Sequence, residues 1–192
     1  MNASVKQQKD DVRKKVLLLR DKLTDIEVEQ KSDVIFHKVT RLENLDSAKV
    51  VLCYLSLGSE VKTTKIVQFL LKIGKKVVVP AYFDDGYILA ELSDLNNLIA
   101  GPYGVLQPKV MHEVNNSSVD LAIIPGVAFS KDGIRLGYGK GVFDKLLAGS
   151  KAVKIGLAFN FQAVDELPRE KHDLVVDILV NEGSTSLPFK NN

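Results

Sequence analysis

Four short segments of this sequence are apolar along nearly their whole length, instead of alternating apolar and polar residues. They lie at residues 49–55 (KVVLCYL), 75–80 (KKVVVP), 120–125 (DLAIIP) and 153–159 (VKIGLAF). A strand with one face in solvent alternates with a period of two, so uniformly apolar strands are those buried on both faces. The pattern predicts a mostly parallel sheet at the centre of an α/β fold.

Segments with helical periodicity separate these strands. Thr24 and Glu27 have the spacing of a capping box and predict the start of a second helix, while a third is expected over about 63–73. Strands that alternate with helices imply helices on both faces of the sheet, a Rossmann-like layering in a single domain, 1–192. The residues predicted to face inward are Val5, Val12, Val16, Leu19 and Leu23; Val28, Ile35, Val39 and Leu42; and Ile66, Val67, Leu70 and Leu71.

The remaining elements are expected to be shorter. Pro80 is predicted to end its strand, and residues 87–92 form a more exposed strand. Prolines and a glycine predict an irregular region over 93–118. A short helix is expected at about 142–147 and a last strand at 177–180. Residues 120–125 are predicted to lead directly into a glycine-rich loop.

Composition excludes several classes of protein. The net charge is only +2, which gives no broad basic surface for nucleic acid. No signal core and no apolar run of roughly 18 residues is present, so neither secretion nor a membrane span is expected. The single Cys53 lies inside an apolar strand and is interpreted as a core residue, which fits a reducing, cytoplasmic location.

The segment GIRLGYGKGVFD (133–144) concentrates glycine and positive charge. Glycine permits positive φ and close approach of a ligand to the backbone, and amide groups ahead of a helix suit phosphate. Arg135 could hold phosphate oxygens with two donors, Lys140 adds a mobile charge, and Asp144 could reach a magnesium ion. The segment therefore predicts a phosphate-binding loop, with a flexible surface turn as the alternative.

Two better-known phosphate loops do not match. A Walker A loop needs Ser or Thr after its Gly-Lys pair, but Gly141 follows Lys140. A dinucleotide fingerprint needs glycine where Val142 stands. Neither a P-loop NTPase nor a Rossmann dehydrogenase is supported, although a sugar-phosphate isomerase or another phosphate-ligand enzyme would explain the loop.

The segment PGVAFSKDGIRLGYGKGVFD (125–144) resembles the signature of the 5-formyltetrahydrofolate cyclo-ligase family, also called methenyltetrahydrofolate synthetase. The resemblance covers nearly the whole chain. It extends to KDDVR and YLSLGSE in the first third, PYGVLQP in the middle, and LAFNFQ and HDLVVD near the end. The YLSLGSE and KDDVR matches are not explained by the isomerase alternative.

The resemblance implies an α/β fold and a reaction that uses ATP and Mg²⁺. In that reaction 5-formyltetrahydrofolate is converted irreversibly to 5,10-methenyltetrahydrofolate, with ADP and phosphate as products. The formyl oxygen attacks the γ-phosphate of ATP, N10 closes the ring, and phosphate leaves. Small-molecule substrates are thus the expected partners, and the chain is expected to act as a monomer.

The resemblance also assigns site residues. Lys140 and Arg135 would act in catalysis, Asp144 and Asp173 would hold magnesium, and His172 would orient Asp173. The ATP site would comprise Lys9, Arg13, Arg135, Leu136, Gly137, Tyr138, Gly139, Lys140, Gly141, Val142 and Phe143. The folate site would comprise Leu55, Glu60, Tyr103, Tyr138, Gly139, Lys140, Gly141 and Val142, with Phe159 and Gln162 nearby.

Three positions depart from the family pattern. Val142 and Phe143 replace a pair of tyrosines, which removes two hydroxyl groups, and Tyr138 stands where the family often has arginine. One lost charge-assisted hydrogen bond corresponds to roughly tenfold to a hundredfold in rate. A relative that binds nucleotide or folate with weak or no turnover is therefore the alternative to an active cyclo-ligase.

Overall fold

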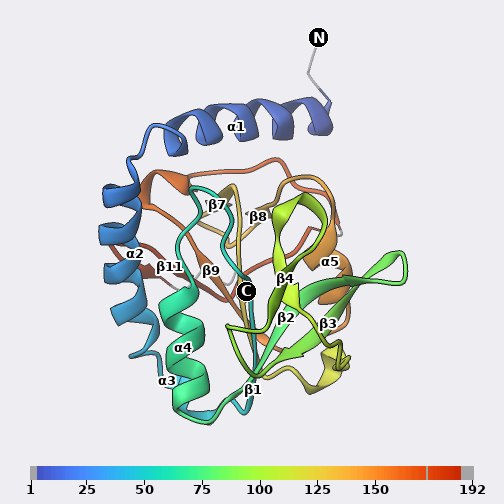
Figure 1. Cartoon of the computed structure of the whole chain (residues 1–192). Helices are drawn as coiled ribbons and strands as arrows, with labels where there is room; N and C mark the ends of the chain where they lie inside the picture. The colour runs from blue at the N-terminus through green and yellow to red at the C-terminus, as the bar shows by residue number, and fades with distance from the viewer. Residues whose placement is uncertain (1–3, 172, 187–192) are drawn as a thin grey trace.

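A seven-stranded, mostly parallel sheet forms the centre of the molecule, as the sequence predicted (Figure 1). The computed structural model describes residues 4–171 and 173–186. Five neighbouring strands, β11-β9-β6-β1-β2, run parallel, and β12 and β3 add antiparallel edges. The strands are β1 (Val50–Cys53), β2 (Lys76–Phe83), β3 (Gly86–Leu92), β6 (Leu121–Ile124), β9 (Val153–Leu157), β11 (Ile178–Val180) and β12 (Thr185–Ser186).

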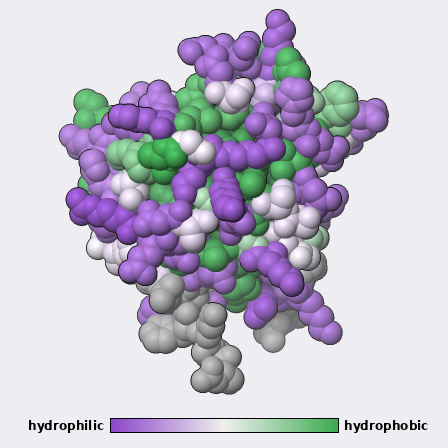
Figure 2. Space-filling model, turned by 90° about the horizontal axis from the view of Figure 1, so that it is seen from below, coloured by the Kyte–Doolittle hydropathy of each residue, from purple (hydrophilic) through white to green (hydrophobic). Residues whose placement is uncertain are grey.

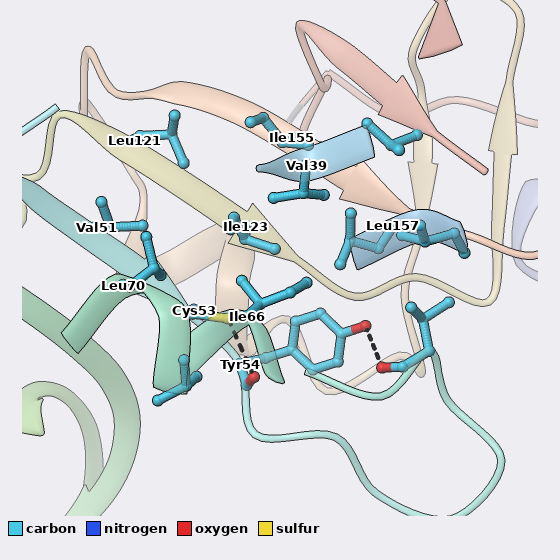
Figure 3. Close-up of a cluster of buried hydrophobic side chains, with 14 of the residues drawn as sticks. Val39, Val51, Cys53, Tyr54, Ile66, Leu70, Leu121, Ile123, Ile155 and Leu157 are labelled. Carbon is cyan, nitrogen blue, oxygen red and sulfur yellow. Dashed lines mark hydrogen bonds between the residues drawn. The ribbon is translucent and has the colours of Figure 1, made fainter. Parts of the chain in front are cut away.

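Helices cover both faces of this sheet. The helices are α1 (Val5–Arg20), α2 (Asp25–Val39), α3 (Glu43–Ser47), α4 (Thr64–Lys72) and α5 (Val142–Leu146). One face packs against α2 and α4 in a cluster that includes Val39, Ile66 and Ile123 (Figure 3). The opposite face packs against α5 and irregular segments around Leu174. The expected layering is confirmed, with far less helix on the second face.

The second helix follows its sequence signals closely. The Thr24 side chain accepts a hydrogen bond from the Glu27 amide, and the Glu27 carboxylate accepts one from the Thr24 amide. This capping box fixes the start of α2 at the predicted residue. Val28, Ile35 and Val39 are buried as predicted. The helix ends before Leu42, which precedes α3.

The predicted inward face of α1 is partly wrong. Val16 is buried, but Val5 and Leu19 are 39% and 41% exposed, whereas Lys9 and Arg20 are buried. The helix lies across one end of the sheet, above the loops that leave the strands, instead of on its apolar face (Figure 1). Polar side chains therefore point inward, because that end of the sheet holds charged groups.

Two small sheets correct the sequence predictions. Residues 120–125 do not lead directly into the glycine-rich segment 133–144, because β7 (Ala128–Ser130) intervenes. That segment itself begins with β8 (Arg135–Leu136), and β7 and β8 form a sheet with β10 (Ala163–Val164). The region 93–118 is not wholly irregular, since it contains an antiparallel pair. These strands are β4 (Leu98–Ala100) and β5 (Leu106–Pro108).

Pro80 does not end its strand, which continues to Phe83. Pairing with β1 extends only to Val78, and the rest of β2 pairs with β3 alone. A proline is tolerated where one side of a strand has no partner, because it lacks the amide that would donate there. The prediction failed because this free side is a property of the sheet and not of the local sequence.

Hydrophilic side chains cover most of the face shown in Figure 2, with smaller hydrophobic areas between them. In the described ranges, every helix is too short or too polar to cross a membrane.

The packing around Phe129 gives a first prediction about stability. A methyl group added at Gly156 of β9 would lie 2.6 Å from the buried Phe129 ring. Gly156→Ala should therefore lower the free energy of unfolding by about 1–3 kcal/mol, as overpacking typically does. Chemical denaturation measures the change, and Phe129→Leu in the same chain should restore part of it. Gly86→Ala, where nothing lies closer than 3.9 Å, is the control, and equal effects of the two glycine variants would contradict the packing argument.

Candidate functional site

A cavity of about 1100 Å³ opens at the carboxyl ends of the parallel strands. Tyr54 and Leu55 follow β1 and Pro125 follows β6, and all three line it. Open α/β sheets bind ligands at this edge. The volume is slightly above the usual range for sites that hold one drug-sized ligand, so two substrates could occupy the cavity together.

The cavity brings together every residue that the sequence assigned to direct contact with ATP, folate or magnesium. They come from α1, the segment after β1, the turn between β4 and β5, the glycine loop and the segment before β11. In chain order they are Lys9, Arg13, Leu55, Glu60, Tyr103, Arg135, Leu136, Gly137, Tyr138, Gly139, Lys140, Gly141, Val142, Phe143, Asp144 and Asp173. The individual roles of these residues stay predictions.

The glycine loop follows a backbone path that side chains would obstruct. Gly139 and Gly141 have φ values of 90° and 65°, in the region that glycine adopts without strain. A methyl group on Gly137 would lie 2.7 Å from Nη1 of Arg135. The loop therefore passes directly over the Arg135 guanidinium, and α5 begins immediately after Gly141.

Arg135 lies beneath this loop, not in open solvent. Its Nη2 donates to Asp144 Oδ2 at 2.8 Å and its Nη1 donates to the Pro125 carbonyl at 3.1 Å. Burial lowers the pKa of Arg135, and Asp144 opposes that shift. The buried Nε has no hydrogen-bond partner within the described ranges. Arg135 thus holds Asp144, and a phosphate contact would have to use its remaining donor capacity.

The first helix contributes two cations. The Lys9 amine donates to Asp173 and Glu170 at 2.7 Å each. Burial lowers the pKa of Lys9, but these hydrogen bonds and charges outweigh it and the net shift is upward. Arg13 Nε donates to the Gly137 carbonyl at 2.8 Å, which ties α1 to the glycine loop. Lys9 and Arg13 are therefore both held at the cavity by partners from other parts of the chain.

The Glu60 carboxylate also lines the cavity and is held by two donors. Its Oε2 accepts from the Leu57 amide and its Oε1 accepts from the Tyr138 hydroxyl, both at 2.8 Å. The Tyr138 hydroxyl in turn accepts from Arg20 at 2.6 Å. Burial, followed by the charge of Glu60, raises the pKa of Tyr138. Tyr138 is therefore directed at Glu60, although it belongs to the glycine loop.

Lys140 projects from the glycine loop toward the turn between β4 and β5. Its amine lies 5.2 Å from the centre of the Tyr103 ring, within the range of a cation–π contact. Tyr103 is 71% exposed and has a φ of 61°, a conformation that non-glycine residues rarely adopt. An exposed aromatic ring held in this way can stack on a planar ligand.

The carboxylates of Asp144 and Asp173 are the candidate ligands of a magnesium ion. Each already contacts a cation, Arg135 or Lys9 respectively, and no cluster of three or more potential metal ligands occurs in the part of the chain described. These residues do not suit a metal ion bound by protein alone. They fit one that arrives with phosphates, because magnesium in nucleotide sites uses one or two carboxylates, and the phosphates would attract the two cations.

Sequence reasoning missed several residues that line the cavity, among them Arg20, Ser59 and Glu170. Arg20 follows Arg13 by seven residues, a spacing that places both on one helical face. Phe159 and Gln162 do not line the cavity. The Gln162 side chain instead stabilises the fold, because its Nε2 donates to the Gly126 and Val127 carbonyls at 3.0 Å. His172 lies outside the described residues, and the burial predicted for Cys53 is confirmed.

Comparisons with known proteins agree on one family. A sequence model of the 5-formyltetrahydrofolate cyclo-ligase family matches residues 5–182. A protein of Caenorhabditis elegans named as a probable 5-formyltetrahydrofolate cyclo-ligase is 27% identical, over 95% of this chain and 97% of its own. Two solved structures of 5,10-methenyltetrahydrofolate synthetases are also similar. The structure from Aquifex aeolicus has a TM-score of 0.85 and 34% sequence identity, and the match covers 96% of this chain and 94% of that chain. The structure from Mycoplasma pneumoniae has a TM-score of 0.73 and 26% sequence identity, and the match covers 91% of this chain and 98% of that chain.

Proposed function

Because the chain belongs to the 5-formyltetrahydrofolate cyclo-ligase family, we propose that it cyclises 5-formyltetrahydrofolate to 5,10-methenyltetrahydrofolate with ATP. One observation supports this proposal above the others. A single cavity is lined by a cationic glycine loop and by the Glu60 carboxylate, which accepts a hydrogen bond from Tyr138 of that loop. A phosphate donor and a ring with N–H donors could therefore bind next to each other, as phosphoryl transfer between them requires.

In the proposed reaction the formyl oxygen attacks the γ-phosphorus of ATP and ADP leaves. N10 then attacks the formyl carbon, the carbon–oxygen bond breaks, and phosphate is released while the N10 proton passes to solvent. Phosphorylation is needed because the oxygen of an amide is a poor leaving group. The protein contributes position and positive charge, which are the main components of catalysis in phosphoryl transfer.

The residues that line the cavity have two sets of proposed roles. Lys140, the loop amides and Arg13 would bind the phosphates, and Lys9 would join them once Asp173 is shared with magnesium. Magnesium held by Asp144 and Asp173 would offset negative charge on the phosphates. Glu60 would accept hydrogen bonds from the pterin ring, with Leu55 beside it and Tyr103 stacked on the ring plane.

A direct assay tests the proposal. Protein mixed with Mg·ATP and 5-formyltetrahydrofolate should produce the near-ultraviolet absorbance of the methenyl product, and omission of ATP should abolish it. Absence of product with folate and ATP both bound would reject turnover.

The second candidate, a binding protein without turnover, is favoured by Val142 and Phe143. Both side chains pack partly against the core, and neither offers a hydroxyl to the cavity. The predicted consequence in an active enzyme is a rate that rises when hydroxyls are restored. Val142→Tyr/Phe143→Tyr should increase kcat by roughly tenfold to a hundredfold if the missing groups contact the transferred phosphate. An unchanged kcat in an active wild type would show that these hydroxyls are not needed here.

A further inference from the structure

Arg20 is a buried cation at the last position of α1, and its side chain has partners on two separate loops. It is 6% exposed. Its Nε donates to Ser59 Oγ at 3.0 Å and its Nη1 donates to the Tyr138 hydroxyl at 2.6 Å. The guanidinium carbon also lies 5.6 Å from the centre of the Tyr138 ring. Arg20 therefore joins the segment after β1 to the glycine loop.

The chemistry of these groups fixes the direction of each hydrogen bond. Arginine has donors only, so the Tyr138 hydroxyl must accept from Arg20 and its own proton is left for Glu60. The raised pKa of Tyr138 keeps that proton in place at neutral pH. With the Leu57 amide on the other oxygen, two donors hold the Glu60 carboxylate in one orientation.

The same contacts stabilise the negative charge of the buried Glu60 carboxylate. Glu60 is only 9% exposed, and none of the salt bridges found among the described residues includes it. An ionised carboxylate at such a site needs hydrogen bonds and a nearby positive charge. Arg20 supplies that charge through the tyrosine. Each carboxylate oxygen accepts about two hydrogen bonds, so Glu60 retains capacity for a ligand.

We propose that Arg20 and Tyr138 are positioning residues that present Glu60 to the folate, and that Tyr138 serves the folate site and not the phosphate site. The inference rests on the proposed function. Tyr138 occupies a glycine-loop position, yet its hydroxyl is committed to Glu60 and Arg20. Tyr138 itself has no charge, but Arg20 contacts its hydroxyl and so places a cation beside it in the cavity. The ligand selected in this way carries adjacent N–H donors on a flat heterocycle, because a fixed carboxylate binds such an edge with two parallel hydrogen bonds.

The test uses Tyr138→Phe and Arg20→Met, which remove the hydroxyl and the charge while keeping most of the side-chain volume. Both variants should raise the KM and the Kd for 5-formyltetrahydrofolate by about tenfold or more, the scale of one hydrogen bond to a charged group. The Kd for ATP should change less than about twofold. The double variant should be little worse than either single one, because the two residues act through one chain of hydrogen bonds. Arg20→Lys, which keeps the charge, should recover part of the loss.

Tyr82→Phe on β2 and Arg41→Met after α2 are the matched controls, and both should leave the two affinities unchanged. Thermal unfolding of each variant without ligands shows whether the fold is retained. Equal loss of ATP and folate affinity, or additive effects in the double variant, would overturn the inference while leaving the proposed function intact. A wild-type protein that binds no folate in calorimetry would overturn both.

Discussion

Replacing Lys140 with alanine should reduce kcat by about a hundredfold to a thousandfold, the usual effect of removing one group that stabilises charge in a transition state. The amine lies near the Tyr103 ring, and no hydrogen bond or ion pair holds it to another residue in the described part of the chain. It can therefore move onto a phosphate without breaking an existing pair.

The other cations of the cavity differ in this respect. Lys9 is paired with Asp173 and Glu170, Arg13 contacts Asp10 and the Gly137 carbonyl, and Arg135 is held by Asp144. Each of these groups has first to share or exchange a partner. The same reasoning predicts that Lys140→Ala weakens ATP binding far more than folate binding.

Steady-state kinetics and calorimetry with each substrate separate these effects. Lys145→Ala is the matched control, since Lys145 lies five residues further along, exposed on α5. If Lys140→Ala retained wild-type turnover and nucleotide affinity, the glycine loop would not be the phosphate site. Equal loss of affinity for both substrates would instead point to a general disturbance of the cavity.

Much of the fold could be predicted because strands that are buried on both faces are apolar along their whole length, and this pattern is visible in the sequence. The strands β1, β2, β6 and β9 are buried on both faces by helices or loops, and their uniformly apolar composition is the consequence. The start of α2 could also be predicted, because a capping box is a local hydrogen-bond pattern between Thr24 and Glu27.

The failures concern features that depend on distant neighbours. The strands β4 and β5 were not predicted, because each has only three residues, too few to show a strand period, and each pairs only with the other strand. Leu19 is exposed and Arg20 buried because α1 crosses the end of the sheet, which its own periodicity does not reveal.

The candidate site also combines features that the local sequence predicts with features that depend on distant residues. Its residues could be identified from motifs, but the partners of their side chains could not. The sequence suggested that Arg135 faces a phosphate and that Tyr138 is a lost cation. In the structure Arg135 supports Asp144 and Gly137 from below, and Tyr138 contacts Arg20, a residue 118 positions away. Such pairings depend on where α1 lies relative to the glycine loop.

Asp144→Asn should lower the free energy of unfolding by about 3 kcal/mol, because it leaves the charge of Arg135 buried without its partner. The Arg135 side chain is 5% exposed and that of Asp144 21%, so solvent can replace little of the lost interaction. For a chain of this length the melting temperature should fall by roughly 6–12 °C. Asparagine can still accept from the Leu174 amide, so the expected loss comes from the charge.

A double variant separates this structural role from a role in binding magnesium nucleotide. Arg135→Met/Asp144→Asn removes both members of the pair and should recover most of the stability, since the buried charge is gone. It should not recover turnover, because neither the carboxylate proposed to hold magnesium nor the guanidinium beneath the loop remains. Asp165→Asn is the control for removing an exposed partner, because the side chains of Lys131 and Asp165 are 68% and 82% exposed and solvent screens their charges. Its stability should match that of the wild type. Recovery of both stability and turnover in the double variant would mean that the pair is only structural, and magnesium would then have to be held by other residues.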